Sequence, residues 1–360
     1  MNDIFNLEEK HEPIVSIIVV NYNGHQHLAD CLDSLYEDNL SPRFEIIVVD
    51  NASIDNSWKI VERYLQLGKP LTLLRSDRNR GYAGGINYAL PQATGKFIAV
   101  LNMDTIVSPG WLSSVVNFFE SHPDAGAVSP LMLLNGDPER INAIGQSVHV
   151  TALGFNRGLG KLRSEIGQEP IRVSGIQGGA FVIRRSVLEQ IGGLDEVGFL
   201  YHEDVDISWQ LQLMGYELYC LPASIVFHDY ALTMYPEKLY LLERNRVAML
   251  LAHLEPIGFL TLIPWLFFTE FMMWGYCLMR GKKFLRAKSA SYEWVNNQWE
   301  STLQRRRLIQ SLRKRNDWQV LKRLSWRYAW DQFVTLGRER GISHRQPSGG
   351  LPLQVNTPPD

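Results

Sequence analysis

Cysteine is scarce in this sequence, and charges of the two signs nearly balance. The 360 residues include three cysteines, Cys31, Cys220 and Cys277, whose wide spacing excludes a disulfide framework or a zinc knuckle and fits a reducing compartment. The formal net charge of −2 gives no bias towards DNA or RNA as a partner. The first fifteen residues carry acids where a signal peptide carries a basic start, so we expect a cytoplasmic N-terminus.

The common glycine-rich nucleotide motifs are also missing. No G-x-G-x-x-G follows the first apolar run and no P-loop is present, which argues against a dinucleotide-binding Rossmann enzyme or a P-loop protein. Short β-branched runs instead alternate with helical patterns: the runs are 16–21, 45–51, 71–75 and 96–104, and the helical patterns are 27–36, 54–67 and 82–93. This alternation predicts βαβ units, and therefore an α/β domain with a mostly parallel central sheet and flanking helices.

The second half of this domain is less regular. Strands are predicted at 125–130, 178–185, 216–222 and 224–229, with helices at 111–120 and 186–192. Between 131 and 174 glycine, asparagine and proline break any period, which indicates loops and hairpins that shape a cleft.

Polar side chains follow the predicted strands at the point where each strand ends. The first strand ends in Asn21-Tyr22, the second in Asp50-Asn51 and the fourth in Asn102-Met103-Asp104. Ligands bind at the carboxyl ends of strands in such sheets. A carboxylate just past a buried strand suits a hard cation, so we interpret Asp104 as a divalent-metal ligand that could bridge the diphosphate of a nucleotide-sugar. The alternative is that Asp104 caps the helix beginning near Pro109.

Residues 202–206 read HEDVD and crowd three carboxylates beside an imidazole. A helix starting near Glu203 would bury a stripe formed by Ile207, Leu211, Met214 and Leu218. Asp204 would lie at the cleft end of this stripe, whereas Asp206, about 200° further around the helix, would be solvent-facing or structural. The alternative is an acid-rich first turn without function, because carboxylates stabilise helix N-termini generally.

Six segments carry a resemblance to a known family: VSIIVVNYNG, EIIVVDNASIDNS, NRGYAGGINYA, GKFIAVLNMDT, GGAFVIRRSVLEQIGGLDE and FLYHEDVDISWQLQLMGYELY. From about Pro13 to Leu232 their order and spacing resemble a family 2 glycosyltransferase with the GT-A fold, in particular the rhamnosyltransferase-like enzymes of bacterial cell-surface polysaccharide assembly. The resemblance implies an inverting transferase that moves a sugar, with rhamnose as a candidate, from a nucleotide-diphosphate donor to a hydroxyl of a glycan or lipid-linked acceptor.

The resemblance also implies roles for individual residues. Tyr22, Asp50 and Asn51 would contact the nucleotide, and Asn79 to Gly85, with Gly81 and Gly84, would line the sugar-phosphate side. Asp104 would hold Mg²⁺ or Mn²⁺ in a D-x-D-type motif whose first acid is replaced by Asn102, and His228 would complete the metal shell. Asp204 would be the catalytic base, with His202 and Glu203 beside the acceptor. Arg244, Asn245 and Arg246 would approach the diphosphate.

A long apolar run, Ile257 to Met279, follows this region and is long enough to span a bilayer. Pro264 and Glu270 interrupt it, so a hinged or interfacial helical pair on a membrane is favoured over a full span. A helical hairpin packed on the catalytic domain or on another subunit is the alternative. Basic residues after the run suit an anionic cytoplasmic surface.

The expected organisation is an N-terminal tail at 1–12, a GT-A catalytic domain at 13–232, a membrane-associated helical region at 233–315 and a partly disordered tail at 316–360. The expected location is cytoplasmic, peripheral to the inner face of the plasma membrane, and an oligomer is left open. Two other functions also remain open: a sugar-nucleotide pyrophosphorylase, and a catalytically silent nucleotide-sugar-binding scaffold.

Overall fold

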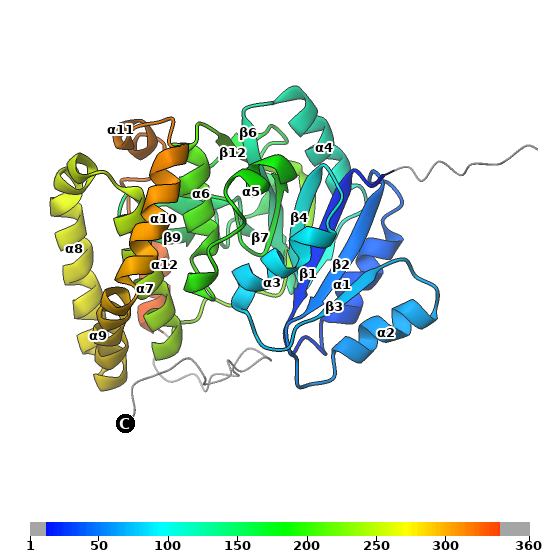
Figure 1. The fold of residues 1–360 in the computed structure, drawn as a ribbon, viewed down its shortest axis with the longest axis horizontal. Helices are drawn as coiled ribbons and strands as arrows, with labels where there is room; N and C mark the ends of the chain where they lie inside the picture. Colours follow the sequence, from blue (N-terminus) through cyan, green and yellow to red (C-terminus); the bar gives the residue numbers. More distant parts are fainter. Residues whose placement is uncertain (1–11, 339–360) are drawn as a thin grey trace, which may run out of the picture.

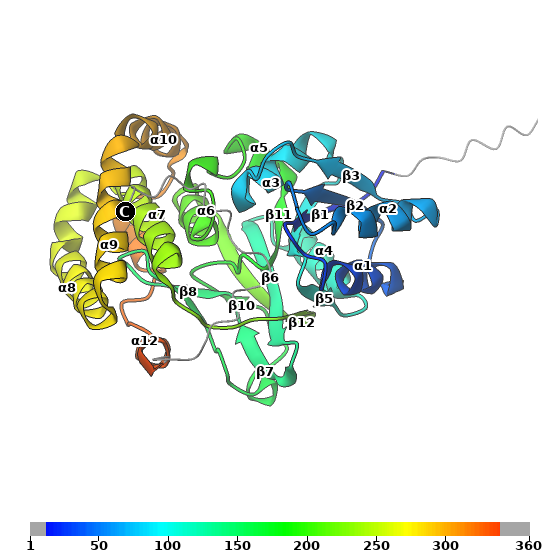
Figure 2. The same ribbon diagram turned by 90° about the horizontal axis from the view of Figure 1, so that it is seen from below.

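A computed structural model describes residues 12–338 as a twisted sheet flanked by helices, with a layer of long helices against one end (Figure 1). In both views the helices α8 (Pro256–Arg280) and α9 (Lys282–Asn297) lie far from α1 (Leu28–Glu37) and α2 (Trp58–Gln66), with the sheet between them (Figures 1 and 2). The predicted tail at 1–12 lies outside the described residues except for its last residue.

The first half of the sheet is parallel, as the sequence predicts. Its strands are β1 (Val15–Asn21), β2 (Phe44–Asp50), β3 (Thr72–Arg75) and β4 (Phe97–Asn102), in the spatial order β4-β1-β2-β3. Their connections contain α1, α2 and α3 (Gly81–Ala89), and a short 3₁₀ turn, η1 (Leu90–Gln92), follows α3. The predicted strand at 96–104 ends earlier than expected, so that Asp104 lies in a turn beyond β4.

The second half of the sheet is mixed. The strand β11 (Ala180–Arg184) lies antiparallel between β4 and β6 (Ala125–Leu134), and β12 (Glu217–His228) runs parallel to β6. Three short strands pair antiparallel at its margins: β5 (Thr105–Val107) and β10 (Ile171–Arg172) with β12, and β7 (Asp137–Ala143) with β6. The strands β8 (Gln146–Val148) and β9 (Gly154–Asn156) form a separate ribbon. The irregular stretch after 131 thus supplies several strands and the short turn η2 (Arg163–Glu165).

The two strands predicted at 216–222 and 224–229 are one long strand, β12. Its register against β6 shifts between Leu221 and Ile225, around Pro222. Proline has no N–H for the ladder, so it reads as a strand break in the sequence, whereas in the sheet it lies at an irregularity within one strand.

Both faces of the sheet are buried. Successive residues of β1 alternate between two apolar clusters: Ile17 and Val19 pack towards α1 and α4 (Trp111–Ser121), whereas Ile18 and Val20 pack towards α3 and α5 (Arg185–Gln190). Side chains of a strand point alternately to the two faces of the sheet. A parallel sheet covered on both faces therefore needs an unbroken apolar run such as SIIVV.

Helix α6 (Glu203–Leu213) is buried on two sides. Ile207 and Leu211 pack towards the sheet, as the predicted stripe requires. The stripe's last member, Leu218, belongs to β12 and not to the helix. On the opposite side Val205 and Trp209 join a third apolar cluster shared with the C-terminal helices. The helix therefore connects the sheet to the helical layer, which the single predicted stripe did not indicate.

The helical layer begins with α7 (Pro236–His253), which packs against α9 and α10 (Trp299–Leu312). The short helix α11 (Asp317–Leu321) and the helix α12 (Trp330–Arg338) follow. Val320 and Leu321 are buried in the third apolar cluster, so the predicted tail from 316 begins with an ordered, packed segment. The remainder of that tail, from 339, lies outside the described residues.

Helix α8 is one continuous helix, so the predicted hinge at Pro264 is wrong. It pairs with α9 through the tight turn at Gly281, and one of its faces packs on the rest of the chain. Among the described residues it is the one helix long and apolar enough to cross a membrane.

Candidate active site

The predicted metal site brings together residues from distant parts of the chain. Asp104 follows β4, and the antiparallel pairing of β5 with β12 places His228 opposite Thr105. His228 Nε2 lies 3.5 Å from Asp104 Oδ1. Burial opposes ionisation of Asp104, but the adjacent His228 outweighs it, so the pKa of this carboxyl is lowered. The helix-cap alternative is wrong, because α4 begins after Gly110 and no side chain caps it.

The donor set at this site fits a divalent cation. Asp104 Oδ1 is buried and has no hydrogen-bond partner. His228 Nδ1 lies 3.0 Å from Asn142 Oδ1 and can donate to it, which leaves Nε2, the ring nitrogen nearer to Asp104, able to ligate a cation when the imidazole is neutral. No group of three metal-ligating side chains occurs within residues 12–338. A cation here would need further oxygen ligands, as Mg²⁺ sites take from water and phosphate.

The predicted base, Asp204, is held by three donors. Its Oδ2 accepts hydrogen bonds from Gln146 Nε2 at 2.5 Å and from the amide of Gly178 at 3.0 Å, and its Oδ1 accepts one from the amide of Val205 at 2.8 Å. Burial raises the pKa of Asp204 to about 6, against the effect of these hydrogen bonds. The group is therefore ionised at neutral pH, with an affinity for protons well above that of an ordinary aspartate.

Glu203 has a different environment. Burial, reinforced by the charge of Asp204, raises its pKa to about 8. The two carboxyls titrate as a coupled pair. Because the ionised form of Asp204 is the one that receives hydrogen bonds, Glu203 keeps the shared proton at neutral pH and Asp204 is the base. The hydrogen bonds thus distinguish two neighbouring acids that composition leaves equivalent, and they favour the acid that the family resemblance implies as base.

The turn Gly178-Gly179, just before β11, lies between these two sites. A Cβ on Gly178 would lie 3.0 Å from Asp204 Oδ2, and one on Gly179 would lie 3.3 Å from His228 Cε1 and 2.9 Å from the methyl of Met132. Glycine is therefore needed for the close approach of the turn to both. The strand predicted at 178–185 includes this pair, although a GG dipeptide ahead of a strand is a signal for such an approach.

Tyr82 of α3 is also bonded to this turn. Its hydroxyl donates to the carbonyl of Gly178 at 2.6 Å. Burial, together with the charges of Glu203, Asp204 and Asp104, raises the pKa of Tyr82 well above its ordinary value. One side chain thus senses the charge of all three carboxylates, Glu203, Asp204 and Asp104.

The predicted donor side is organised around Asn51, which follows β2. Its side chain bonds the side chain of Asn79, the carbonyl of Gly81 and the amide of Arg80. Gly81 has a φ of +72°, and a Cβ there would lie 2.0 Å from the carbonyl oxygen of Phe199. Asn51 therefore fixes the loop that opens α3, and the first two amides of the helix are bonded to the side chain of Asn79 and the carbonyl of Phe199.

The other donor candidates lie nearby. Asp50 is buried, with Arg75 Nε at 3.7 Å from its carboxylate, and Tyr22 is partly exposed beyond β1. Asn102 ends β4, and its amide is bonded to the carbonyl of Gly179. Gly84 lies on the side of α3 that faces Arg80 and Glu196, in a separate hollow.

The segment before the base is strained and is held by α7. Phe199, Tyr201 and His202 all have positive φ, which costs energy for residues other than glycine. The side chain of Asn245 lies within 3.1 Å of the carbonyls of residues 198, 200 and 201. Arg244 bonds the carbonyl of Gly198 and stacks over Trp294. Arg244 and Asn245 therefore hold the loop that precedes Asp204. This role takes the place of the predicted contact between these two residues and a diphosphate.

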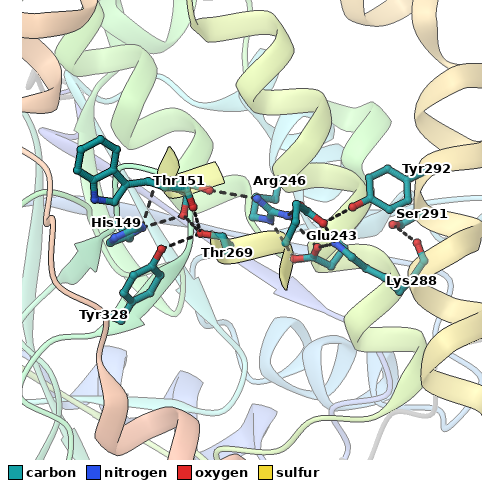
Figure 3. A network of polar contacts seen from close by, with 11 residues as sticks. His149, Thr151, Glu243, Arg246, Thr269, Lys288, Ser291, Tyr292 and Tyr328 are labelled. Carbon is teal, nitrogen blue, oxygen red and sulfur yellow. Dashed lines mark hydrogen bonds and ion pairs between the residues drawn. The ribbon is translucent and has the colours of Figure 1, made fainter. Parts of the chain in front are cut away.

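Arg246, the third residue of that prediction, is fully buried in an ion cluster, so a diphosphate contact is wrong for it. Figure 3 shows Arg246 and Lys288 around Glu243, with Tyr292 on the α9 side. Glu270 of α8 accepts from Arg246 at 2.5 Å and from Lys288 at 2.8 Å. The charges of the cluster balance, so its members stabilise one another in a buried site.

His202 and Asp206 flank the two acids. Burial, with a further effect of Arg246, lowers the pKa of His202 to about 3, so its imidazole is neutral at neutral pH. Asp206 is buried on the far side of α6, paired with Arg305, which also bonds Asp195 at 2.7 Å. Its role is structural; the solvent-facing alternative is wrong.

Comparison with solved structures defines the class of fold. The structure titled GalNAc-T7 with UDP, GalNAc and Mn²⁺ aligns with a TM-score of 0.56 at 19% identity, over 69% of this chain and 49% of that one. S. aureus TarS 1–349 in complex with UDP-GlcNAc aligns with a TM-score of 0.54 at 19% identity, over 86% and 90% of the two chains. The predicted GT-A fold is confirmed.

Sequence comparison gives the family. Residues 16–192 match the model for glycosyl transferase family 2, so this part of the chain is a family 2 glycosyltransferase domain. An uncharacterized glycosyltransferase of Haemophilus influenzae is 28% identical over 31% of this chain and 34% of its own length. The N-acetylglucosaminyl-diphospho-decaprenol L-rhamnosyltransferase of Mycobacterium tuberculosis is 26% identical over 61% of this chain and 76% of its own length. The chain thus spans about a third of the first relative and about three quarters of the second.

Proposed function

We propose that this protein transfers a sugar from a nucleotide-diphosphate donor to a hydroxyl of a glycan or lipid-linked acceptor, with inversion at the anomeric carbon. The observation that carries the proposal is the arrangement on either side of the Gly178-Gly179 turn. An ionised carboxylate with a raised proton affinity, Asp204, lies on one side, and a cation-binding pair, Asp104 and His228, lies on the other.

The reaction uses these groups in one step. Asp204 accepts the proton of the acceptor hydroxyl while that oxygen forms its bond to the anomeric carbon, on the face opposite the nucleotide. The bond from this carbon to the diphosphate oxygen breaks, and the diphosphate leaves with the electron pair. Gln146 and the amide of Gly178 orient Asp204 throughout. Mg²⁺ or Mn²⁺ bound by Asp104 and His228 would stabilise negative charge on the diphosphate.

The substrate contacts are assigned as follows. Tyr22, Asp50 and Asn51 contact the nucleotide; Asn79, Gly81 and Asn102 line the donor's sugar-phosphate side, whereas Gly84, in its separate hollow, does not; His202 and Glu203 contact the acceptor. The partial exposure of Tyr22 and Glu203 supports these assignments. Neutral Glu203 can donate a hydrogen bond to a sugar oxygen, which an ionised carboxylate cannot.

The donor sugar is rhamnose and the acceptor is linked to a lipid diphosphate, in the assembly of a bacterial cell-surface polysaccharide. The name of the mycobacterial relative supports both assignments. The corresponding location is the cytoplasm, at the inner face of the plasma membrane. The catalytic domain extends over 13–232 and the membrane-associated helical region over 233–315, with α7 contributing Arg244 and Asn245 to the active-site loop.

A thermal-shift panel of nucleotide-sugars, with and without Mn²⁺, identifies the donor, because a ligand that binds the folded state raises the melting temperature. Transfer is then measured with that donor and a panel of synthetic lipid-diphosphate acceptors. Release of a nucleoside triphosphate from donor and pyrophosphate would assign the protein to the pyrophosphorylases. Donor binding without turnover on any acceptor of the panel would favour a silent scaffold.

A further inference from the structure

The outer face of α8 exposes a continuous row of large apolar side chains. Ile257, Leu260, Phe267, Phe271 and Leu278 recur at helical spacing along one side, and Ile257, Phe267 and Phe271 are 77%, 75% and 70% exposed. Single exposed apolar residues are ordinary, but a contiguous row over a helix of 25 residues marks a surface that contacts something else.

The inner face of the same helix is fixed to the protein. Leu262 and Met273 are buried in two apolar clusters, and Thr269 bonds the hydroxyls of Thr151 and Tyr328. Glu270 closes the ion cluster with Arg246 and Lys288. To cross a bilayer, α8 would have to leave these partners, and the cluster would lose one of its two carboxylates while its two cations stayed buried.

Charge at the C-terminal end of the exposed row is basic, whereas the N-terminal end begins beside Glu255, which pairs with Arg313. Between Pro256 and Tyr292 the sequence contains a single acid, Glu270, and this acid is turned inwards in the ion cluster. Lys282, Lys283 and Arg286 are exposed at the C-terminal end of the row, next to Arg280. An apolar face bordered by basic residues complements the acyl chains and anionic headgroups of a lipid surface.

We propose that the exposed face of α8 is a docking surface for an anionic lipid bilayer, and that the helix lies in the interface without crossing it. The opposite face of the helix stays on the protein and keeps Glu270 in its cluster, so membrane contact requires no rearrangement of the fold. The inference gives a structural basis to the peripheral location in the proposed function and rests on that part of it. The apolar row enters the bilayer to a depth of about 5 to 10 Å.

Vesicle sedimentation tests this surface with the full-length chain. Sucrose-loaded vesicles of phosphatidylglycerol and phosphatidylethanolamine should sediment the protein, whereas phosphatidylcholine vesicles should bind it more weakly. The double variant Phe267→Asp/Phe271→Asp should lower the partition coefficient by about tenfold or more. The triple variant Lys282→Ala/Lys283→Ala/Arg286→Ala should lower binding to the anionic vesicles by at least about tenfold and leave the weak binding to phosphatidylcholine unchanged.

A matched control is Leu67→Asp, which changes an exposed apolar side chain at the end of α2 and should leave binding unchanged. Melting temperatures and molecular sizes equal to those of the wild type show that the variants retain the fold. Equal binding of the Phe267→Asp/Phe271→Asp variant and the wild type would overturn the proposal. So would a wild-type dimer that this variant converts to monomer, since the face would then belong to a second copy.

Alkaline carbonate treatment of membranes separates the two membrane geometries. A helix lying in the interface is released, and retention in the membrane would overturn the surface location in favour of a span. Vesicle binding needs neither donor nor acceptor, so its failure would overturn the docking surface and leave glycosyl transfer standing. Conversely, binding without turnover would leave the docking surface in place and count against the proposed function.

Discussion

Replacing Asp204 with asparagine should abolish transfer and, at the same time, stabilise the fold at neutral pH. The substitution is nearly isosteric and removes the ionisable oxygen that accepts the acceptor's proton. General-base catalysis contributes about 10²- to 10⁴-fold to a rate, so turnover should fall by that factor. Donor binding should be retained, because Asp204 lies across the Gly178-Gly179 turn from the metal site.

The stability effect follows from the pKa. Asp204 has its pKa raised from 3.8 to about 6 in the folded state, chiefly by burial. The folded state therefore binds more protons than the unfolded state between these values, and stability falls as pH rises through this window. Above this window the ionised carboxylate destabilises the fold. A shift of about two pKa units corresponds to at most about 3 kcal/mol. The partial exposure of the side chain and its interaction with Glu203 make the actual destabilisation smaller.

Asparagine carries no charge, so the penalty disappears in the variant. Melting temperatures measured in parallel should show the variant a few degrees more stable than the wild type at neutral pH, and the difference should vanish near about pH 4, where the wild-type carboxyl is protonated. Asp124→Asn, at an exposed aspartate far from α6 in the sequence, is the matched control. It should change neither turnover nor the pH dependence of the melting temperature.

Two results would refute this reasoning. Turnover close to that of the wild type would show that another group accepts the proton. A melting temperature lowered equally at both pH values would show that the hydrogen bonds of Asp204 outweigh the cost of its buried charge. The wild-type rate itself should fall as pH drops through about 6, tenfold per unit below it, because the base becomes protonated.

Three further perturbations test the rest of the site. Gln146→Leu removes a hydrogen bond to ionised Asp204, so the acidic limb of the pH profile of kcat should move to higher pH by about one unit. An unchanged acidic limb would show that Gln146 does not position Asp204. Asn245→Ala should lower the free energy of unfolding by about 1 to 3 kcal/mol in denaturant titration, and it should reduce kcat more than it changes KM. Asn297→Ala, at an exposed asparagine, is the control and should change neither. Asp104→Ala should abolish the Mn²⁺-dependent part of the thermal shift given by the donor, and an unchanged Mn²⁺ titration would contradict the metal assignment.

Local patterns in the sequence predicted much of the fold. The unbroken run of β1, the helical spacing of α1 to α3 and the polar strand ends are properties of neighbouring residues, so they can be read without knowing what each element packs against. Helical phase likewise separated Asp204 from Asp206 correctly, because positions around a helix follow from spacing alone. Pro222 misled the prediction of β12, because the pairing with β6 that accommodates it comes from a distant segment.

By itself, the sequence determined the α/β sheet, its ligand-binding edge and the acids available there. Only the tertiary structure decided which groups share a site: His228 reaches Asp104 through the pairing of β5 with β12, and Gln146 reaches Asp204 from an irregular stretch without a period. It also decided that Glu270 faces inwards to Arg246 and leaves an apolar face of α8 outside. The physical reason is that such contacts join residues far apart in the chain, whose meeting depends on packing and not on local conformational preference.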